Sequence, residues 1–220
     1  MNDVFFAGGL LNGDFSFPAQ RLLGEKHIRT VKRAAWLFTR QAKTSRFRTV
    51  GEEVEFGTED GLPPVVLTLK DGRRIALRGK IDRIDRWDDG SDAYLRVIDY
   101  KSARKDIDPT RLWYGLQLQL MLYLQAAAQG MKGNAAGAFY FRVNDPLVEA
   151  EDVKSAAEAA IAKTLQLKGV VLSDVKVVGA MDAEGTALGQ IFTKSGGVSA
   201  YASAYSREEM QSLLDHTQKT

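Results

Sequence analysis

Cysteine is absent from the 220 residues of this chain. Disulfides, thiolate zinc sites and cysteine-ligated iron–sulfur clusters are therefore excluded within it. Histidine is scarce too: the chain has 2, which lie far apart at positions 27 and 216, and we expect His27 to be an exposed helix residue. Any metal must then be held mainly by oxygen, which favours Mg²⁺, Mn²⁺ or Ca²⁺.

The chain also lacks long apolar runs and a strong charge of one sign. No stretch is long enough to span a membrane as a helix, and no basic segment precedes the apolar residues near Met1, so we expect no membrane association and no secretory signal. The net charge of +2 permits nucleic-acid binding without arguing for it. The absence of cysteine fits a reducing compartment, and we expect a cytoplasmic protein.

The order of the predicted elements indicates an α/β protein. Residues 1–18 have no clear period and are expected to be an irregular lead-in to a single domain over 19–220. Asp71-Gly72 is a typical hairpin turn. Hydrophobic periodicity predicts helices over 19–44, 108–129, 150–167 and 206–216, and strands over 49–57, 65–70, 73–87, 93–101 and 134–143. This sequence of helix, three-strand meander, helix and strand predicts a mixed central β-sheet flanked by helices.

Two neighbouring strands of the meander carry the candidate active site. Asp82 lies on the first, and Asp99 and Lys101 lie on the second, where alternation places both side chains on one face. Two carboxylates and the backbone carbonyl of Tyr100 suffice for Mg²⁺, which keeps several waters. Lys101 can orient or deprotonate a water, or neutralise charge on a phosphate. Surface salt bridges are the simpler alternative, but the buried Val97-Ile98 run leaves Asp99 in need of a partner, which favours the metal site.

Other polar residues are candidates for supporting roles. Gln119 and Tyr123 lie four residues apart on one helix face, either as phosphate- or water-binding groups or as the polar edge of a core helix. Glu53 shares a strand face with Glu55, and either can complete the acidic site, although solvent-facing acids on an edge strand are the simpler interpretation. Arg83 and Asp85 are expected to form a salt bridge that braces the hairpin.

These motifs together resemble the RecB-like branch of the PD-(D/E)XK nucleases. The residues that carry the resemblance are Gly79-x-x-Asp82-Arg83-x-Asp85, Ile98-Asp99-Tyr100-Lys101-Ser102 and Gln119-x-x-x-Tyr123. The likeness runs from about residue 24 to the end and is strongest to the C-terminal nuclease domain of AddB-type B subunits of bacterial ATP-dependent helicase–nucleases. It implies a restriction-endonuclease-like core, Mg²⁺ (or Mn²⁺) held by Asp82 and Asp99, and catalysis by Lys101. It further implies a DNA substrate, single-stranded or at DNA ends, and a helicase partner in the bacterial cytoplasm.

The chain departs from this family in one respect that bears on function. Family members carry four cysteines that bind an iron–sulfur cluster, and this chain has none, so we expect either a fragment of the nuclease domain or a member without the cluster. The chain also has no Walker A motif, so it cannot itself hydrolyse ATP in the manner of P-loop proteins.

Three functions are consistent with this sequence. The first is a metal-dependent exodeoxyribonuclease domain of a helicase–nuclease that processes double-strand DNA ends for recombinational repair. The second is a free-standing RecB-like single-strand exonuclease, which would cut without a motor. The third is a catalytically inert DNA-binding or assembly module. A carbohydrate hydrolase that uses Asp82 and Asp99 is disfavoured, because the adjacent Lys101 would keep both acids ionised.

Overall fold

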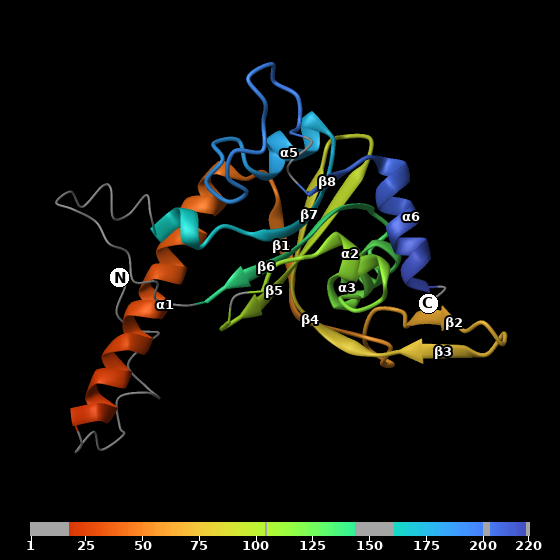
Figure 1. The fold of residues 1–220 in the computed structure, drawn as a ribbon, viewed down its shortest axis with the longest axis horizontal. Coiled ribbons are helices and arrows are strands. Elements are labelled where there is room, and N and C mark those ends of the chain that lie inside the picture. The colour runs from red at the N-terminus through yellow and green to blue at the C-terminus, as the bar shows by residue number, and fades with distance from the viewer. Residues whose placement is uncertain (1–17, 104, 144–160, 200–202, 219–220) are drawn as a thin grey trace.

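A six-stranded mixed sheet forms the centre of the molecule (Figure 1). The computed structural model describes residues 18–103, 105–143, 161–199 and 203–218. The strands lie in the order β1 (Arg48–Phe56), β4 (Gly79–Asp88), β5 (Ala93–Lys101), β6 (Asn134–Arg142), β7 (Lys168–Leu172) and β8 (Ala204–Tyr205). The first three are antiparallel, β6 is parallel to β5, β7 is antiparallel to β6, and β8 is parallel to β7. The predicted mixed sheet is confirmed.

Helices cover both faces of this sheet, and strand alternation decides which side chains meet them. On one face, Phe38 of α1 (Pro18–Thr44) packs against the rings of Tyr100 and Phe141, with centroids 5.7 and 4.3 Å away. Asp99 alternates with Tyr100 on β5 and therefore points to the other face. That face is covered by α3 (Gln119–Gly130), which packs on β5 and β6 and against α6 (Arg207–Gln218) (Figure 1).

The predicted strand over 73–87 is wrong as a single element. Residues 74–77 form β3 (Arg74–Leu77), which pairs with β2 (Val65–Thr68) in a separate two-stranded sheet, and β4 begins only at Gly79. The division follows from β1, which pairs with β4 as far as Phe56 opposite Gly79 and then turns at Gly57, where φ is +75°. Residues before Gly79 therefore have no β1 partner and pair with β2 instead.

The predicted helix over 108–129 is also divided. Asp108 caps α2 (Pro109–Trp113) by accepting the backbone N–H groups of Thr110 and Arg111, as the sequence predicts. The helix then ends because Gly115 has a φ of +74°, and the N–H groups of Gly115 and Leu116 return to the carbonyls of Leu112 and Arg111. This is a Schellman motif, which stops the helix before α3 starts at Gln119.

The C-terminal third combines confirmed and corrected expectations. The predicted helix over 206–216 is confirmed as α6, and a capping box opens it: the Ser206 N–H donates to Glu209, and the Glu209 N–H donates to Ser206. The predicted helix over 150–167 falls mostly outside the described residues, as does the lead-in over 1–17. Gly169 lies inside β7, and the segment that follows β7 forms α5 (Val175–Met181).

Replacing Gly169 by alanine should destabilise the fold, because β7 approaches β6 closely there. A Cβ at Gly169 would lie 1.9 Å from the carbonyl oxygen of Ala138, which is backbone and cannot move aside freely. We expect urea denaturation to show a loss of about 1–3 kcal/mol in the free energy of unfolding. Gly179→Ala is the matched control, since nothing lies within 4 Å of its added Cβ in α5. Equal effects of the two variants would contradict the close approach.

Candidate active site

The candidate site begins where the ladder between β4 and β5 ends. The last paired residues are Arg83 and Ile98, and beyond them the Asp82 side chain takes the place of a strand partner. Its Oδ2 accepts a hydrogen bond of 2.8 Å from the backbone N–H of Tyr100. The N–H and C=O groups of one strand residue point to the same side, so the Tyr100 carbonyl faces the same gap as Asp82.

Asp99 and Lys101 form a close pair on the face covered by α3. Asp99 is only 2% exposed, and its Oδ2 lies 2.6 Å from the Nζ of Lys101. Burial raises the pKa of Asp99, the Lys101 ammonium opposes this, and the nearby Asp82 carboxylate raises the pKa further. Two carboxylates that lie this close together form a site that attracts cations.

The oxygen donors of this site fit a divalent ion of the Mg²⁺ class. Asp82, Asp99 and the Tyr100 carbonyl supply oxygen alone, and Mg²⁺ completes its shell with waters. Within the described part of the chain, no group of three or more His, Asp or Glu side chains gathers where it could hold a metal. An ion bound here would therefore rely on the two aspartates, the carbonyl and water.

The structure places Glu53 of β1 against Lys80 of β4. Glu53 forms an ion pair with Lys80, and its side chain is 65% exposed. Its φ of +53° is uncommon for a residue other than glycine. Glu53 raises the pKa of Lys80 through their hydrogen bond and charge, and Asp82 adds to that shift. The geometry gives Glu53 a contact with Lys80, the residue two positions before Asp82.

Gln119 and Tyr123 meet each other at the start of α3. The Gln119 Nε2 donates a hydrogen bond of 2.9 Å to the Tyr123 hydroxyl, and the Tyr123 ring packs edge-on against Phe56 at 5.9 Å. Tyr123 also helps to disfavour ionisation of Tyr140, the neighbour of Asp99 in the sheet register. The structure thus places Tyr123 near Tyr140, the residue opposite Asp99 in the sheet.

Tyr140 is a further residue of this site, and no sequence motif identifies it. The parallel pairing of β5 and β6 places it opposite Asp99, and its hydroxyl is buried without a hydrogen-bond partner among the described residues. Burial, with the charge of Asp99 and the proximity of Tyr123, raises the pKa of Tyr140 to about 12. Its hydroxyl therefore stays protonated and can donate a hydrogen bond. The sequence shows only an aromatic run over 139–141, which is typical of a buried strand.

The expected brace between Arg83 and Asp85 is confirmed and is larger than predicted. The Nε of Arg83 lies 2.7 Å from Asp85 Oδ1, and a guanidinium nitrogen of Arg96 lies 2.8 Å from Oδ2. The hydroxyl of Thr49 donates to the same carboxylate at 2.9 Å. This buried cluster fixes β1, β4 and β5 side by side next to the candidate site.

A family model described as the PD-(D/E)XK nuclease superfamily matches residues 8–219. The chain belongs to this superfamily. Membership agrees with the mixed sheet, and it makes the chain a nuclease-superfamily domain of restriction-endonuclease-like fold.

Relatives of this PD-(D/E)XK domain are named as the B subunit of an ATP-dependent helicase/deoxyribonuclease. The protein from Alkaliphilus oremlandii is 37% identical over 199 residues, covering 86% of this chain and 17% of that protein. The one from Ruminiclostridium cellulolyticum is 40% identical over 181 residues, with 79% and 16% covered. The one from Clostridioides difficile is 35% identical over 223 residues, with 94% and 19% covered. The chain thus spans less than a fifth of the length of these curated relatives.

Tyr123→Phe should slow cleavage without unfolding this PD-(D/E)XK domain. The change removes the hydroxyl that holds Gln119 and keeps the ring that packs on Phe56. A neutral hydrogen bond contributes about 1 kcal/mol, so we expect a roughly fivefold loss of cleavage rate on labelled DNA. Tyr205→Phe is the matched control, since it removes a half-buried hydroxyl from β8, far across the sheet. Equal rates in both variants would show that the Gln119–Tyr123 bond does not position the site.

Proposed function

We propose that this chain hydrolyses DNA phosphodiester bonds with a divalent metal, with Asp82, Asp99 and Lys101 as its catalytic residues. The observation that supports this most directly is the Lys101 ammonium 2.6 Å from a buried Asp99 carboxylate, next to an Asp82 anchored on the Tyr100 N–H. An ion pair with only a structural role would need Asp99 and Lys101, but not the second carboxylate of Asp82. The presence of Asp82 beside them supports a site in which a bound cation lies between the two carboxylates.

Each residue has a distinct role in this proposal. Asp82, Asp99 and the Tyr100 carbonyl would hold Mg²⁺ or Mn²⁺, and a bound ion would polarise the phosphate and acidify a water. Lys101 supplies a positive charge at its Nζ, where it orients the attacking water or offsets the charge that develops on the phosphate. Gln119 and Tyr123 would position the strand, and the protonated Tyr140 hydroxyl offers a hydrogen-bond donor beside Asp99.

We further propose that the chain acts as an exodeoxyribonuclease module together with a helicase partner. The support is the name of the relatives, which joins a helicase to a deoxyribonuclease. In this role it would cut single strands released from double-strand DNA ends, for recombinational repair in the bacterial cytoplasm. The described part of the chain contains no helix that is long and apolar enough to cross a membrane.

Cleavage of end-labelled single- and double-stranded DNA tests the proposal. We expect products from single strands with Mg²⁺ or Mn²⁺, none in EDTA, and shortening from an end rather than internal cuts. Products from double-stranded DNA without a helicase would favour the free-standing exonuclease over a motor-dependent module. A folded chain that binds DNA but yields no product with either metal, alone or with a helicase partner, would overturn the proposal in favour of an inert binding module.

A further inference from the structure

A cavity of about 300 Å³ opens beside the candidate active site, and basic side chains dominate its lining. It lies between the ends of β5 and β6 and the segment over 163–168 that leads into β7. The ionisable side chains around it are those of Lys101, Lys105, Arg142, Lys163 and Lys168, with Asp106 as the one carboxylate and the Tyr140 phenol beside them. Lys101 and Tyr140 belong to the candidate active site, so cavity and site are continuous.

Little of this positive charge is balanced within the described part of the chain. Lys101 is paired with Asp99, whereas Arg142, Lys163 and Lys168 form no ion pair with any described residue. The Arg142 Nε is buried and has no hydrogen-bond partner among those residues. A buried guanidinium nitrogen without an acceptor is costly, and an anion that enters the cavity would supply one.

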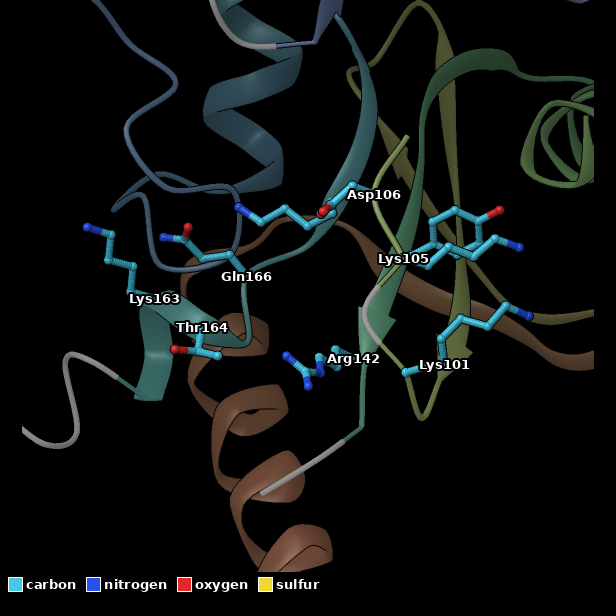
Figure 2. A pocket seen from close by; sticks show the side chains of 10 residues that line it. Lys101, Lys105, Asp106, Arg142, Lys163, Thr164 and Gln166 are labelled. Carbon is cyan, nitrogen blue, oxygen red and sulfur yellow. The ribbon is translucent and has the colours of Figure 1, made fainter. Parts of the chain in front are cut away.

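Figure 2 shows how the labelled side chains are arranged. Arg142 lies between two groups, with Thr164 and Gln166 on one side and Lys101 and Lys105 on the other. In this view Lys101 and Lys105 extend away from Arg142, whose guanidinium is directed toward the segment that carries Thr164. Basic side chains thus lie on both sides of the end of β6, from Lys101 in the candidate active site to Arg142 and Lys163. The Nζ of Lys105 lies 4.8 Å from the centre of the Tyr140 ring, which places Lys105 beside the candidate active site.

We propose that this cavity is a phosphate-binding subsite that holds a backbone phosphodiester of the strand being cut, next to the scissile one. Arg142 is its main ligand, because a guanidinium fork matches two phosphate oxygens. Lys168 and Lys163 add charge, and the Gln166 amide offers a further donor. The assignment rests on the proposed nuclease function, since it is that function which places the scissile phosphate at Asp99 and Lys101.

The first test is binding of a short single-stranded oligonucleotide in EDTA, where no cleavage occurs. Arg142→Gln and Lys168→Gln should each reduce the slope of log K against log salt concentration by about 0.7, the value for one lost phosphate contact on a single strand. Lys194→Gln removes an exposed charge that does not line the cavity and should leave the slope unchanged. Thermal melting checks whether Arg142→Gln is destabilised. If it is, Lys168→Gln alone carries the test, because Lys168 is exposed and its replacement should not disturb the fold. Slopes for both cavity variants equal to that of Lys194→Gln would overturn the proposal.

The second test locates the phosphate by its distance from the cut. Oligonucleotides with one neutral methylphosphonate at successive linkages are cleaved in Mg²⁺, and the scissile bond fixes the register. In the wild-type chain, a methylphosphonate at one particular linkage near the cut should slow cleavage relative to the all-phosphodiester strand. In Arg142→Gln, the methylphosphonate at that linkage should make no difference to the cleavage rate. If the methylphosphonate slowed Arg142→Gln as much as the wild-type chain, the proposal that Arg142 binds an internal phosphodiester would be overturned. The same proposal would be wrong if the cleavage rate depended only on a phosphate monoester at the end of the strand. If the chain never cuts DNA, the proposed nuclease function is wrong. The phosphate-binding subsite is still tested separately, by the binding measurement in EDTA.

Discussion

Asp99→Asn should abolish metal-dependent DNA cleavage and leave the fold intact. The variant has the same shape as the native residue, so the buried site keeps its packing, but it loses the charge that pairs with Lys101 and would hold the metal. We expect the cleavage rate to fall by at least about a hundredfold, the range seen when one charged or hydrogen-bonding group is removed from an active site. The rate is measured on end-labelled single-stranded DNA, and circular dichroism checks the fold.

Lys101→Met should have a comparable effect, and the two changes should not add. A positioned group that transfers protons or neutralises developing charge contributes about 10²–10⁴ to a rate. Residues that act as one unit lose their contribution together. The double variant Asp99→Asn/Lys101→Met should therefore be about as slow as the slower single variant. Additive losses would show that the two residues act in separate steps.

Asp88→Asn is the matched control for these variants. Asp88 lies on β4, the strand that carries Asp82, but at its far end and with an exposed side chain. It should cleave at the wild-type rate. Mn²⁺ binding, followed by electron paramagnetic resonance, should weaken in Asp99→Asn and not in Asp88→Asn. A folded Asp99→Asn that cuts DNA at the wild-type rate would place the chemistry elsewhere in the chain.

The part of the site that the sequence predicts depends on contacts between neighbours in the chain. Asp82, Asp99 and Lys101 lie on two strands joined by a short turn, and alternation along each strand fixes their faces. Gln119 and Tyr123 lie one helical turn apart, so their contact also follows from local geometry. The capping box at Ser206 is predictable for the same reason.

The part that the sequence does not predict depends on pairings between distant segments. Tyr140 reaches Asp99 only because β6 runs parallel to β5, after the two helices that separate these strands in the chain. Arg142 and Lys168 border one cavity through the same sheet, although neither belongs to a motif. The sequence does not predict the break at Gly115, because the apolar period continues across it, whereas its φ of +74° ends the helix. The spacing of apolar residues predicts which face of an element is buried, but it does not predict where the backbone turns.

Asp85→Asn should cost the fold about 3–5 kcal/mol of unfolding free energy, the range for removing one partner of a buried ion pair. Asp85 is fully buried, and its carboxylate faces both Arg83 and Arg96. The Arg96 side chain is only 4% exposed, so its charge would be left with little solvent and no carboxylate at that position. Urea denaturation followed by tryptophan fluorescence measures the loss. An unchanged midpoint would show that the cluster contributes no stability.

Asp88→Asn serves again as the control, because β4 repeats the same spacing at its exposed end. Arg86 pairs with Asp88 as Arg83 pairs with Asp85, but the Asp88 side chain is 57% exposed. Exposed pairs contribute little, so this variant should keep the wild-type midpoint. The two Arg–Asp pairs share their charges, their strand and their spacing, and they differ in burial. A difference in unfolding free energy between Asp85→Asn and Asp88→Asn would therefore be due to burial.

The pH dependence of the Asp85→Asn effect gives a second, independent measure. Burial alone would raise the pKa of Asp85, but the guanidinium groups of Arg96 and Arg83 outweigh it, and the folded-state pKa lies below the ordinary value. The ionised carboxylate therefore adds stability above the unfolded pKa of about 3.9, and this stability is lost as the pH falls through the lower folded value. The difference in unfolding free energy between wild type and Asp85→Asn should be constant near neutral pH and shrink below about pH 4. A difference that stays constant into acid would mean that packing, rather than charge, holds this cluster together.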